Sequence, residues 1–262
     1  MKETSGSADR RPTVASIREE LGRATYEELP RVIARYEGDG RAQVAKMLES
    51  KRAHYARETK ERLRVQAMYD LMYETTGGDD GIVLGVDEVG RGSVAGPLTV
   101  AAVALPRRPI VWGLNDSKKL TPQRREELAE VIRREALAVG IAHIEPEAID
   151  ACGMAASLRV AMKRAIENAG VEADCVLIDG MPVNIHCNEK TIVHGDARVA
   201  CIAAASIVAK VTRDAIMVAQ DEVYPGYYFA KSKGYASAEH IEAIRRLGLS
   251  PIHRATFCRD FV

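Results

Sequence analysis

The spacing of hydrophobic residues changes at a short segment rich in glycine and aspartate, residues 75–81. Residues 13–74 before it show only helical spacing, whereas short apolar runs alternate with helical segments after it. Such a segment is typical of a linker. The sequence therefore predicts two parts. Residues 1–80 form a small all-α N-terminal extension with a disordered start and this Gly/Asp linker, and residues 81–262 form an α/β domain.

Composition limits the class of protein. The chain has 262 residues, 47% of them hydrophobic and 28% charged, which is enough apolar material for a core. Net charge is zero, so any binding of nucleic acid must come from local patches. The five cysteines form no CxxC pair and favour a reducing compartment. The start is polar and no apolar run reaches about 18 residues, so we expect a cytoplasmic protein without a membrane segment.

The extension is expected to hold three helices, at residues 13–21, 26–36 and 41–73. The third helix is rich in basic side chains, with a smaller number of acids among them. One interpretation is a solvated helix face, as most charged runs are. The other is a helix that contacts phosphates. Under the second interpretation, removing residues 1–75 should weaken binding of a nucleic-acid duplex.

The second part predicts strands at residues 82–86, 98–105, 138–144, 175–178 and 191–193, with helices at 122–134, 154–168, 199–221 and 238–247. Thr121 is a plausible N-cap for the first of these helices, with Pro122 in the position after it. Strands come first and then alternate with helices. This order predicts a mixed sheet flanked by helices.

Three of the predicted strands end at an acid beside a glycine. Asp87 and Glu88 follow the first strand, Asp179 precedes Gly180, and Asp196 follows Gly195. Any one of these acids could be an ordinary turn residue, and Asp196 could be a helix cap. Together they suggest that several strand ends converge on one spot.

Carboxylates gathered at one spot repel one another unless a cation neutralises them. Oxygen ligands without histidine pairs suit Mg²⁺ or Mn²⁺ better than zinc. Two such ions, about 3.5–4 Å apart, can activate a water molecule and stabilise a leaving oxygen. The sequence therefore predicts a two-metal site for the in-line hydrolysis of a phosphodiester.

An ordered series of motifs between residues 81 and 258 is similar to one protein family. The series comprises DEVGRG at residues 87–92, NDSKKL at 115–120, LIDG at 177–180, GD at 195–196, AASIVAKVTRD at 204–214, KGY at 233–235 and HR at 253–254. In these motifs the chain resembles the type 2 ribonucleases H, the bacterial ribonuclease HII family. A lone Asp-Glu pair would be weak evidence, but the ordered series is specific.

The resemblance implies a ribonuclease H-like fold and a metal-dependent endoribonuclease. Its substrates would be the RNA strand of RNA/DNA hybrids and single ribonucleotides in duplex DNA, nicked on the 5′ side to give 3′-hydroxyl and 5′-phosphate ends. The family's four acids correspond to Asp87, Glu88, Asp179 and Asp196. Asp87 and Asp179 would hold both ions, and the other two acids would each complete one side.

The resemblance also implies the residues that read the substrate. Gly90, Arg91 and Gly92 would test for a 2′-hydroxyl with nearby backbone groups, and Tyr235 would lie against the neighbouring sugar. A tyrosine packed in a loop is the alternative for Tyr235. A further group would bind phosphates: Asn115, Ser117, Lys118 and Lys119.

Other basic residues have no clear role in the sequence. Arg124 and Arg125 precede two glutamates, so a solvated face is the better prediction for that pair. Lys210 could face phosphate or solvent.

Some positions depart from the family pattern. His194 stands where lysine is usual, Ser232 stands where histidine is frequent, and the chain ends soon after Arg254. Two alternatives remain: the sister ribonuclease HIII type, against which Arg91 argues, and a nucleic-acid-binding module without catalysis. Retained acids argue against the second alternative, because carboxylates without metal would repel a duplex. A monomer is expected.

Overall fold

The computed structural model describes residues 11–78 and 81–262. Most of the start predicted to be disordered, residues 1–12, lies outside the described residues, as does part of the linker. Contacts within the chain divide it into two compact units, and the division falls between Arg64 and Val65. The domain boundary expected near residue 80 remains a prediction.

The first unit is helical, as predicted for the extension. It contains α1 (Val14–Arg23), α2 (Leu29–Arg35) and the first part of α3 (Ala42–Thr75). The Thr13 side chain caps α1 by accepting a hydrogen bond from the Ser16 amide at 3.1 Å. Pro30 lies in the first turn of α2, where a missing N–H costs no helical hydrogen bond.

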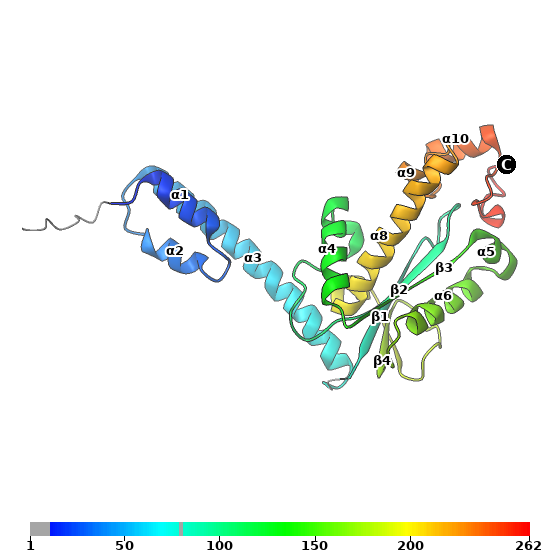
Figure 1. Ribbon diagram of the computed structural model, residues 1–262, viewed down its shortest axis with the longest axis horizontal. Helices are drawn as coiled ribbons and strands as arrows, with labels where there is room; N and C mark the ends of the chain where they lie inside the picture. Colours follow the sequence, from blue (N-terminus) through cyan, green and yellow to red (C-terminus); the bar gives the residue numbers. More distant parts are fainter. Residues whose placement is uncertain (1–10, 79–80) are drawn as a thin grey trace, which may run out of the picture. The chain divides into compact units, whose positions relative to one another are not determined.

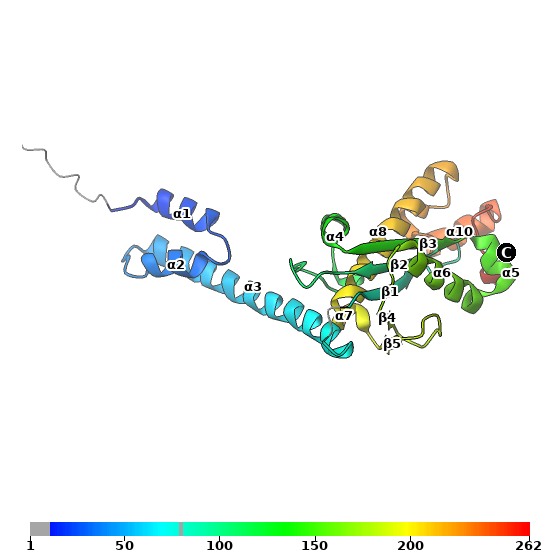
Figure 2. The same ribbon diagram turned by 60° about the horizontal axis from the view of Figure 1, so that its bottom comes forward.

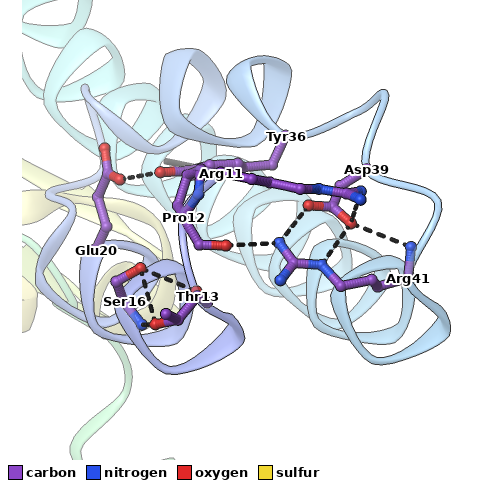
Figure 3. A network of polar contacts seen from close by, with 8 residues as sticks. All are labelled: Arg11, Pro12, Thr13, Ser16, Glu20, Tyr36, Asp39 and Arg41. Atoms are coloured by element: carbon purple, nitrogen blue, oxygen red, sulfur yellow. Dashed lines mark hydrogen bonds and ion pairs between the residues drawn. The ribbon is translucent and has the colours of Figure 1, made fainter. Parts of the chain in front are cut away.

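A small apolar core and a polar network hold this first unit together. Ile17, Leu21 and Val44 are buried where the three helices meet. Figure 3 shows Asp39 accepting hydrogen bonds from the side chains of Arg11 and Arg41. The segment before α1 is thus tied to the loop between α2 and α3, in a unit that is too small to bury much surface.

The last part of α3 belongs to the second unit. Val65, Met68 and Met72 are buried in the core of that unit, and the Tyr69 hydroxyl accepts a hydrogen bond from the Val111 amide at 3.1 Å. Removal of residues 1–75, as the sequence suggested, would therefore open this core and lower stability. Substitutions on the helix surface are a better test of the extension.

The second unit is built on a five-stranded mixed sheet, as predicted. The strand order is β3-β2-β1-β4-β5; β1 and β3 are antiparallel to β2, whereas β1, β4 and β5 are mutually parallel. Their bounds are β1 Val83–Val89, β2 Leu98–Ala104, β3 Ala138–Ile144, β4 Cys175–Asp179 and β5 Glu189–Ile192.

Helices cover both faces of this sheet (Figures 1 and 2). On one face lie α4 (Pro122–Glu135) and α8 (Ala200–Val223), and on the other lie α5 (Pro146–Cys152) and α6 (Met154–Asn168). The approach of α8 to β1 is close enough that a Cβ on Gly85 would lie 2.2 Å from the Cys201 carbonyl carbon. Only glycine fits at that position.

Two strands differ from their predicted bounds by more than one residue. β1 continues to Val89 because β2 stays paired with it, with Asp87 opposite Ala101 and Glu88 opposite Val100. β5 starts at Glu189 and ends before Val193. Composition alone could not place these ends, because cross-strand pairing decides them.

Several short elements were not predicted. They are α5, α7 (Gly195–Arg198), α9 (Phe229–Ser232), and the 3₁₀ turns η1 (Ser117–Lys119) and η2 (Ala255–Phe257). At most two helical turns long, they show no period that a sequence can reveal. The last long helix, α10 (Ala238–Leu247), has the predicted bounds.

A chain of two histidines is buried among these C-terminal elements. The Ser250 amide donates to His253 Nδ1 at 2.9 Å, so the other ring nitrogen of His253 carries its proton and donates to His240 Nε2 at 3.0 Å. His240 in turn donates from Nδ1 to the Tyr235 carbonyl at 2.9 Å. Both rings are therefore neutral in this arrangement.

This histidine chain predicts a loss of stability in mild acid. Burial and the neighbouring His240 lower the pKa of His253 from 6.5 to about 4, and burial lowers the pKa of His240. Unfolded histidine takes up a proton below pH 6.5, whereas folded His253 does so only near pH 4. Stability is therefore complete above pH 6.5 and falls as the pH drops from 6.5 towards 4. Thermal unfolding across this range measures the loss.

His253→Gln should have a lower melting temperature at neutral pH but a smaller drop between pH 6.5 and 4.5 than the unsubstituted chain. His54→Gln is the control, because His54 is exposed on α3. An equal acid-induced drop in the His253 and His54 variants would contradict the assignment.

Candidate active site

The parallel strands bring their acids to one edge of the sheet. The pairing of β1 with β4 ends at Val86 and Ile178, and the next residues on the two strands are Asp87 and Asp179. Side chains alternate along a strand, so both aspartates project to the face that packs on α8, like Val83 and Leu177. The convergence of strand ends expected from the sequence is present here.

A cavity of about 410 Å³ opens at this edge. All four predicted acids line it, although Glu88 follows Asp87 directly and belongs to the alternate side of β1. The strand has no β4 partner beyond Val86, which leaves that edge of β1 open to the cavity. Its other lining residues are Val89, Ser117, Lys118, Ser206, Lys210 and Tyr235.

The fourth acid reaches the cavity through a short helix. Asp196 lies in the first turn of α7, and its side chain is buried. The start of this helix is fixed to β4, because the Gly195 amide donates to Asp179 Oδ1 at 2.7 Å. His194 precedes it in a left-handed conformation, with φ 57°, and is exposed.

Burial and mutual repulsion disfavour the charged forms of these acids. Burial, followed by the charges of Glu88 and Asp179, raises the pKa of Asp87 well above its usual value. Burial likewise raises the pKa of Glu88, and the charge of the nearby Arg91 partly offsets this rise. Both carboxylates are largely buried, and the charge of Asp179 disfavours the charged form of each.

Asp196 lies within reach of a further acid that the sequence patterns did not single out. Burial is the main cause that raises the pKa of Asp196, followed by the charges of Asp116 and Asp179, while Lys118 acts in the opposite direction. Asp116 itself caps η1 by accepting from the Lys118 amide at 2.9 Å. The turn that presents Lys118 is thus held by an acid near the site.

Three polar residues beside the acids come from α8 and its neighbours. Ser117 and Ser206 share a hydrogen bond of 2.9 Å between their hydroxyls, and Lys210 pairs with Asp214 at 2.7 Å. Sequence reasoning did not select Ser206. A signal existed, since Ser206 is a polar residue in an otherwise apolar stretch of α8.

Arg125 supports the same region from α4. Its guanidinium donates to the Ser117 and Leu120 carbonyls at 2.8 and 3.0 Å, so it braces η1 rather than forming a solvated face. Arg124 does pair with Glu127 at the surface, as expected.

The predicted substrate-reading residues divide into two groups. Ser117, Lys118 and Tyr235 line the cavity. The others lie outside the lining: Gly90, Arg91, Gly92, Asn115 and Lys119. Of these, Arg91 makes a 3.6 Å ion pair with Glu88, which does line the cavity.

Two of the outlying residues make local contacts instead. Asn115 accepts from the Asp116 amide at 2.9 Å, and Lys119 lies 4.0 Å from Asp116. Ser232, a departure from the family pattern, accepts from the Gly234 amide at 3.2 Å.

The donor set has the chemistry of a hard-cation site. Four carboxylates offer only oxygen and are at least partly buried, and the raised pKa values of Asp87, Glu88 and Asp196 show that positive charge would stabilise those three. Within the described residues, no three Asp, Glu, His or Cys side chains are already arranged to hold one ion. The ligand types therefore fit a divalent ion, and the side chains would have to draw together around it.

Comparison with known proteins places this site in a family. A protein-family model described as "Ribonuclease HII" matches residues 84–260. The chain belongs to the ribonuclease HII family. A second model, "Ribonuclease HII N-terminal domain", matches residues 13–75. A Ribonuclease HII of Listeria monocytogenes is 40% identical over 247 residues, which cover 94% of each chain.

Solved structures share the fold. Ribonuclease H2 from Pyrococcus horikoshii superposes with a TM-score of 0.58 and 25% identity, covering 69% of this chain and 96% of that one. Bst-RNase HIII in complex with Mn²⁺ gives a TM-score of 0.52 at 20% identity, covering 66% of this chain and 63% of that one. The second likeness concerns the fold alone.

Family membership makes this chain a ribonuclease H, an endoribonuclease that acts on RNA/DNA hybrids. This finding confirms the enzyme and fold class expected from the sequence. In the described residues, no helix has both the length and the apolar character needed to span a bilayer.

Proposed function

We propose that this chain hydrolyses the RNA strand of hybrids and also nicks duplex DNA on the 5′ side of single embedded ribonucleotides. The products would carry 3′-hydroxyl and 5′-phosphate ends. One observation supports this most: the four acids line a single cavity, with Tyr235 also in its wall and the Gly90–Gly92 loop joined to it through Glu88. One chain supplies all these groups, and we propose that it acts as a monomer in the cytoplasm.

The proposed ligands of two Mn²⁺ or Mg²⁺ ions are Asp87, Glu88, Asp179 and Asp196. Bound there, the ions would supply Lewis acidity to activate a water molecule and to stabilise the leaving oxygen. The protein's part is to hold the carboxylates. Gly195 fixes Asp179 through its amide, and the Glu88 amide donates to Asp87 Oδ1 at 2.8 Å.

Positive side chains in the cavity would orient the substrate backbone. Lys118 acts on Asp196 electrostatically, and Lys210 shares the same cavity, so both are placed to attract a phosphate towards the acids. Ser117 and Ser206 offer hydroxyls beside them. Acids alone would repel a nucleic acid, and these groups offset that repulsion locally.

Discrimination between RNA and DNA is proposed to lie at the cavity rim. Backbone groups of Gly90, Arg91 and Gly92 can approach a sugar closely because two of the three residues lack a side chain. Tyr235 lines the cavity with 38% of its surface exposed, so its ring is available to stack on a sugar or base. The packed-loop alternative for this tyrosine fits the exposure less well.

The first test uses a DNA duplex that contains one ribonucleotide. We expect a single nick on its 5′ side with Mn²⁺ or Mg²⁺ and none with a chelator, because the buried carboxylates need a cation to bind a phosphate. Gel analysis of end-labelled strands locates the cut. Absence of a nick under every metal condition would reject the proposal, and cleavage of continuous hybrids alone would indicate a specificity like that of ribonuclease HIII.

A second prediction concerns the acids. Asp87→Asn and Asp179→Asn should each lower the cleavage rate by at least about 10³-fold while the duplex still binds, because an amide cannot supply the ligand charge. Rates and binding constants are measured on the same duplex. Glu172→Gln, on the surface of the same unit, is the control and should retain activity; substantial activity in either aspartate variant would contradict the ligand assignment.

A third prediction tests the basic helix of the extension. Lys46, Arg57 and Lys60 are exposed on α3, and their spacing places them on one face of the helix. If this face binds phosphates, changing all three to glutamine should weaken hybrid binding. The plot of log K against log salt should also flatten by about 0.9 for each phosphate that the protein no longer neutralises.

The matched control changes Arg18, Arg31 and Lys51 to glutamine. It removes the same charge from the same unit, away from that face of α3. Equal salt slopes in the two triple variants would reject a specific role for the basic face and leave it a solvated surface.

A further inference from the structure

Two arginines are fully buried behind the rim of the site. Arg213 on α8 and Arg254 near the C-terminus each have 0% exposure. Among the described residues, every hydrogen bond that either guanidinium makes goes to an uncharged oxygen. Burying a charge costs free energy unless good hydrogen bonds offset that cost, so we expect the hydrogen bonds of these two arginines to have a structural role.

Arg213 ties two distant segments together. Three of its hydrogen-bond acceptors lie in the segment after the Gly90–Gly92 loop, and a fourth lies in the turn before Tyr235. The acceptors are Pro97 O at 2.8 Å, Ser93 Oγ at 2.8 Å, Ala95 O at 2.9 Å and Lys233 O at 2.8 Å.

Arg254 grips the same loop from the other side. It donates from Nε and Nη2 to the Gly96 carbonyl at 3.1 and 2.9 Å. It also donates from Nη1 to the Arg91 carbonyl at 3.2 Å, which is the middle residue of the Gly90–Gly92 loop. One guanidinium therefore fixes both ends of residues 91–96.

Backbone hydrogen bonds join the same segments. Together with the bonds of Arg213 and Arg254 they form what we call the arginine clamp. The Gly234 carbonyl accepts from the Val94 and Ala95 amides at 2.9 and 3.1 Å, and the Arg254 amide donates to the Val94 carbonyl at 2.8 Å. Residues 94–96 thus lie between the turn that carries Tyr235 and the C-terminal segment. Neither partner could shift without breaking several of these bonds.

The arginine clamp also contacts Tyr235 and Gly90, two of the residues proposed to recognise the ribonucleotide. The Arg213 guanidinium carbon lies 5.5 Å from the centre of the Tyr235 ring. On the other side, a Cβ on Gly90 would lie 2.2 Å from Arg213 Nε, and Gly90 has φ +86°. Ser93 links the two as well, since its hydroxyl accepts from Arg213 and donates to the Gly90 carbonyl at 2.9 Å.

We propose that Arg213 and Arg254 are positioning residues that set the separation between the Gly90–Gly92 loop and Tyr235, and thereby the preference for a single ribonucleotide. This inference rests on the proposed function of that loop and ring. Neither arginine is proposed to touch the substrate.

Lysine cannot replace arginine in this role. A guanidinium is a planar fork that donates to several fixed acceptors at once, whereas an ammonium is a compact charge on a flexible stem. Arg213→Lys and Arg254→Lys therefore keep the charge and lose the geometry. Ser93→Ala is a milder variant that cuts only the link between Arg213 and Gly90.

The experiment compares two substrates in the full-length protein with Mn²⁺. One is a DNA duplex with a single ribonucleotide and the other a continuous RNA/DNA hybrid. In Arg213→Lys and Arg254→Lys we expect the ratio of kcat/KM values, single ribonucleotide over hybrid, to fall on the order of tenfold, because small misplacements of orienting groups carry penalties of this kind. Ser93→Ala should shift the ratio in the same direction by less. Arg245→Lys, on the exposed face of α10, is the control and should leave the ratio unchanged.

A ratio is the right measure because a general loss of folded protein lowers both rates equally and leaves it unchanged. If the lysine variants do not fold, Ser93→Ala decides alone, and an unchanged ratio in it overturns the inference. If they fold and cut both substrates with the original ratio, the inference also fails while the proposed function stands. A wild-type chain that never nicks at a single ribonucleotide overturns both.

Discussion

The repulsion between carboxylates at the edge of the sheet is the constraint around which the second unit is built. Asp87 and Asp179 follow the last paired residues of two parallel strands, so the sheet itself forces them together. Like charges held in a pocket of low dielectric are unfavourable. A fold that keeps such an arrangement must stabilise it elsewhere. Here the stabilisation comes from the buried helix α8 and from backbone amides that donate to Asp87 and Asp179.

The part of the site that was predictable from the sequence depends on short-range patterns. Asp87 and Asp179 were recognisable because each follows an apolar run that ends near glycine, and apolar runs of this length are strands. Their meeting required the parallel pairing of β1 with β4, which the alternation of strands and helices suggests but does not define. Asp196 had the weaker signal, since it lies in a four-residue helix that has no period.

The roles that the sequence did not reveal belong to residues that act across long distances in the chain. Arg213 and Arg254 contact a loop more than a hundred residues before them, and no local pattern reports such contacts. Arg125 looked like part of a self-neutralised surface, yet it braces the turn that presents Lys118. In each case a basic side chain donates to backbone carbonyls. Every residue type has a backbone carbonyl, so the residue types along the chain do not mark these acceptors. Composition and motif spacing are therefore blind to this kind of contact.

α8 carries Ser206, Lys210 and Arg213 at intervals of four and three residues, which places them on one face of a single helix. That face spans about 10 Å from the first residue to the last. The helix therefore sets the distance between the acids of the cavity and the Gly90–Gly92 loop. A single substitution along it changes one contact and leaves this distance unchanged. Insertion or deletion of one residue between Ser206 and Arg213 would rotate one end by about 100° relative to the other, so this stretch should accept changes of residue type but not of length.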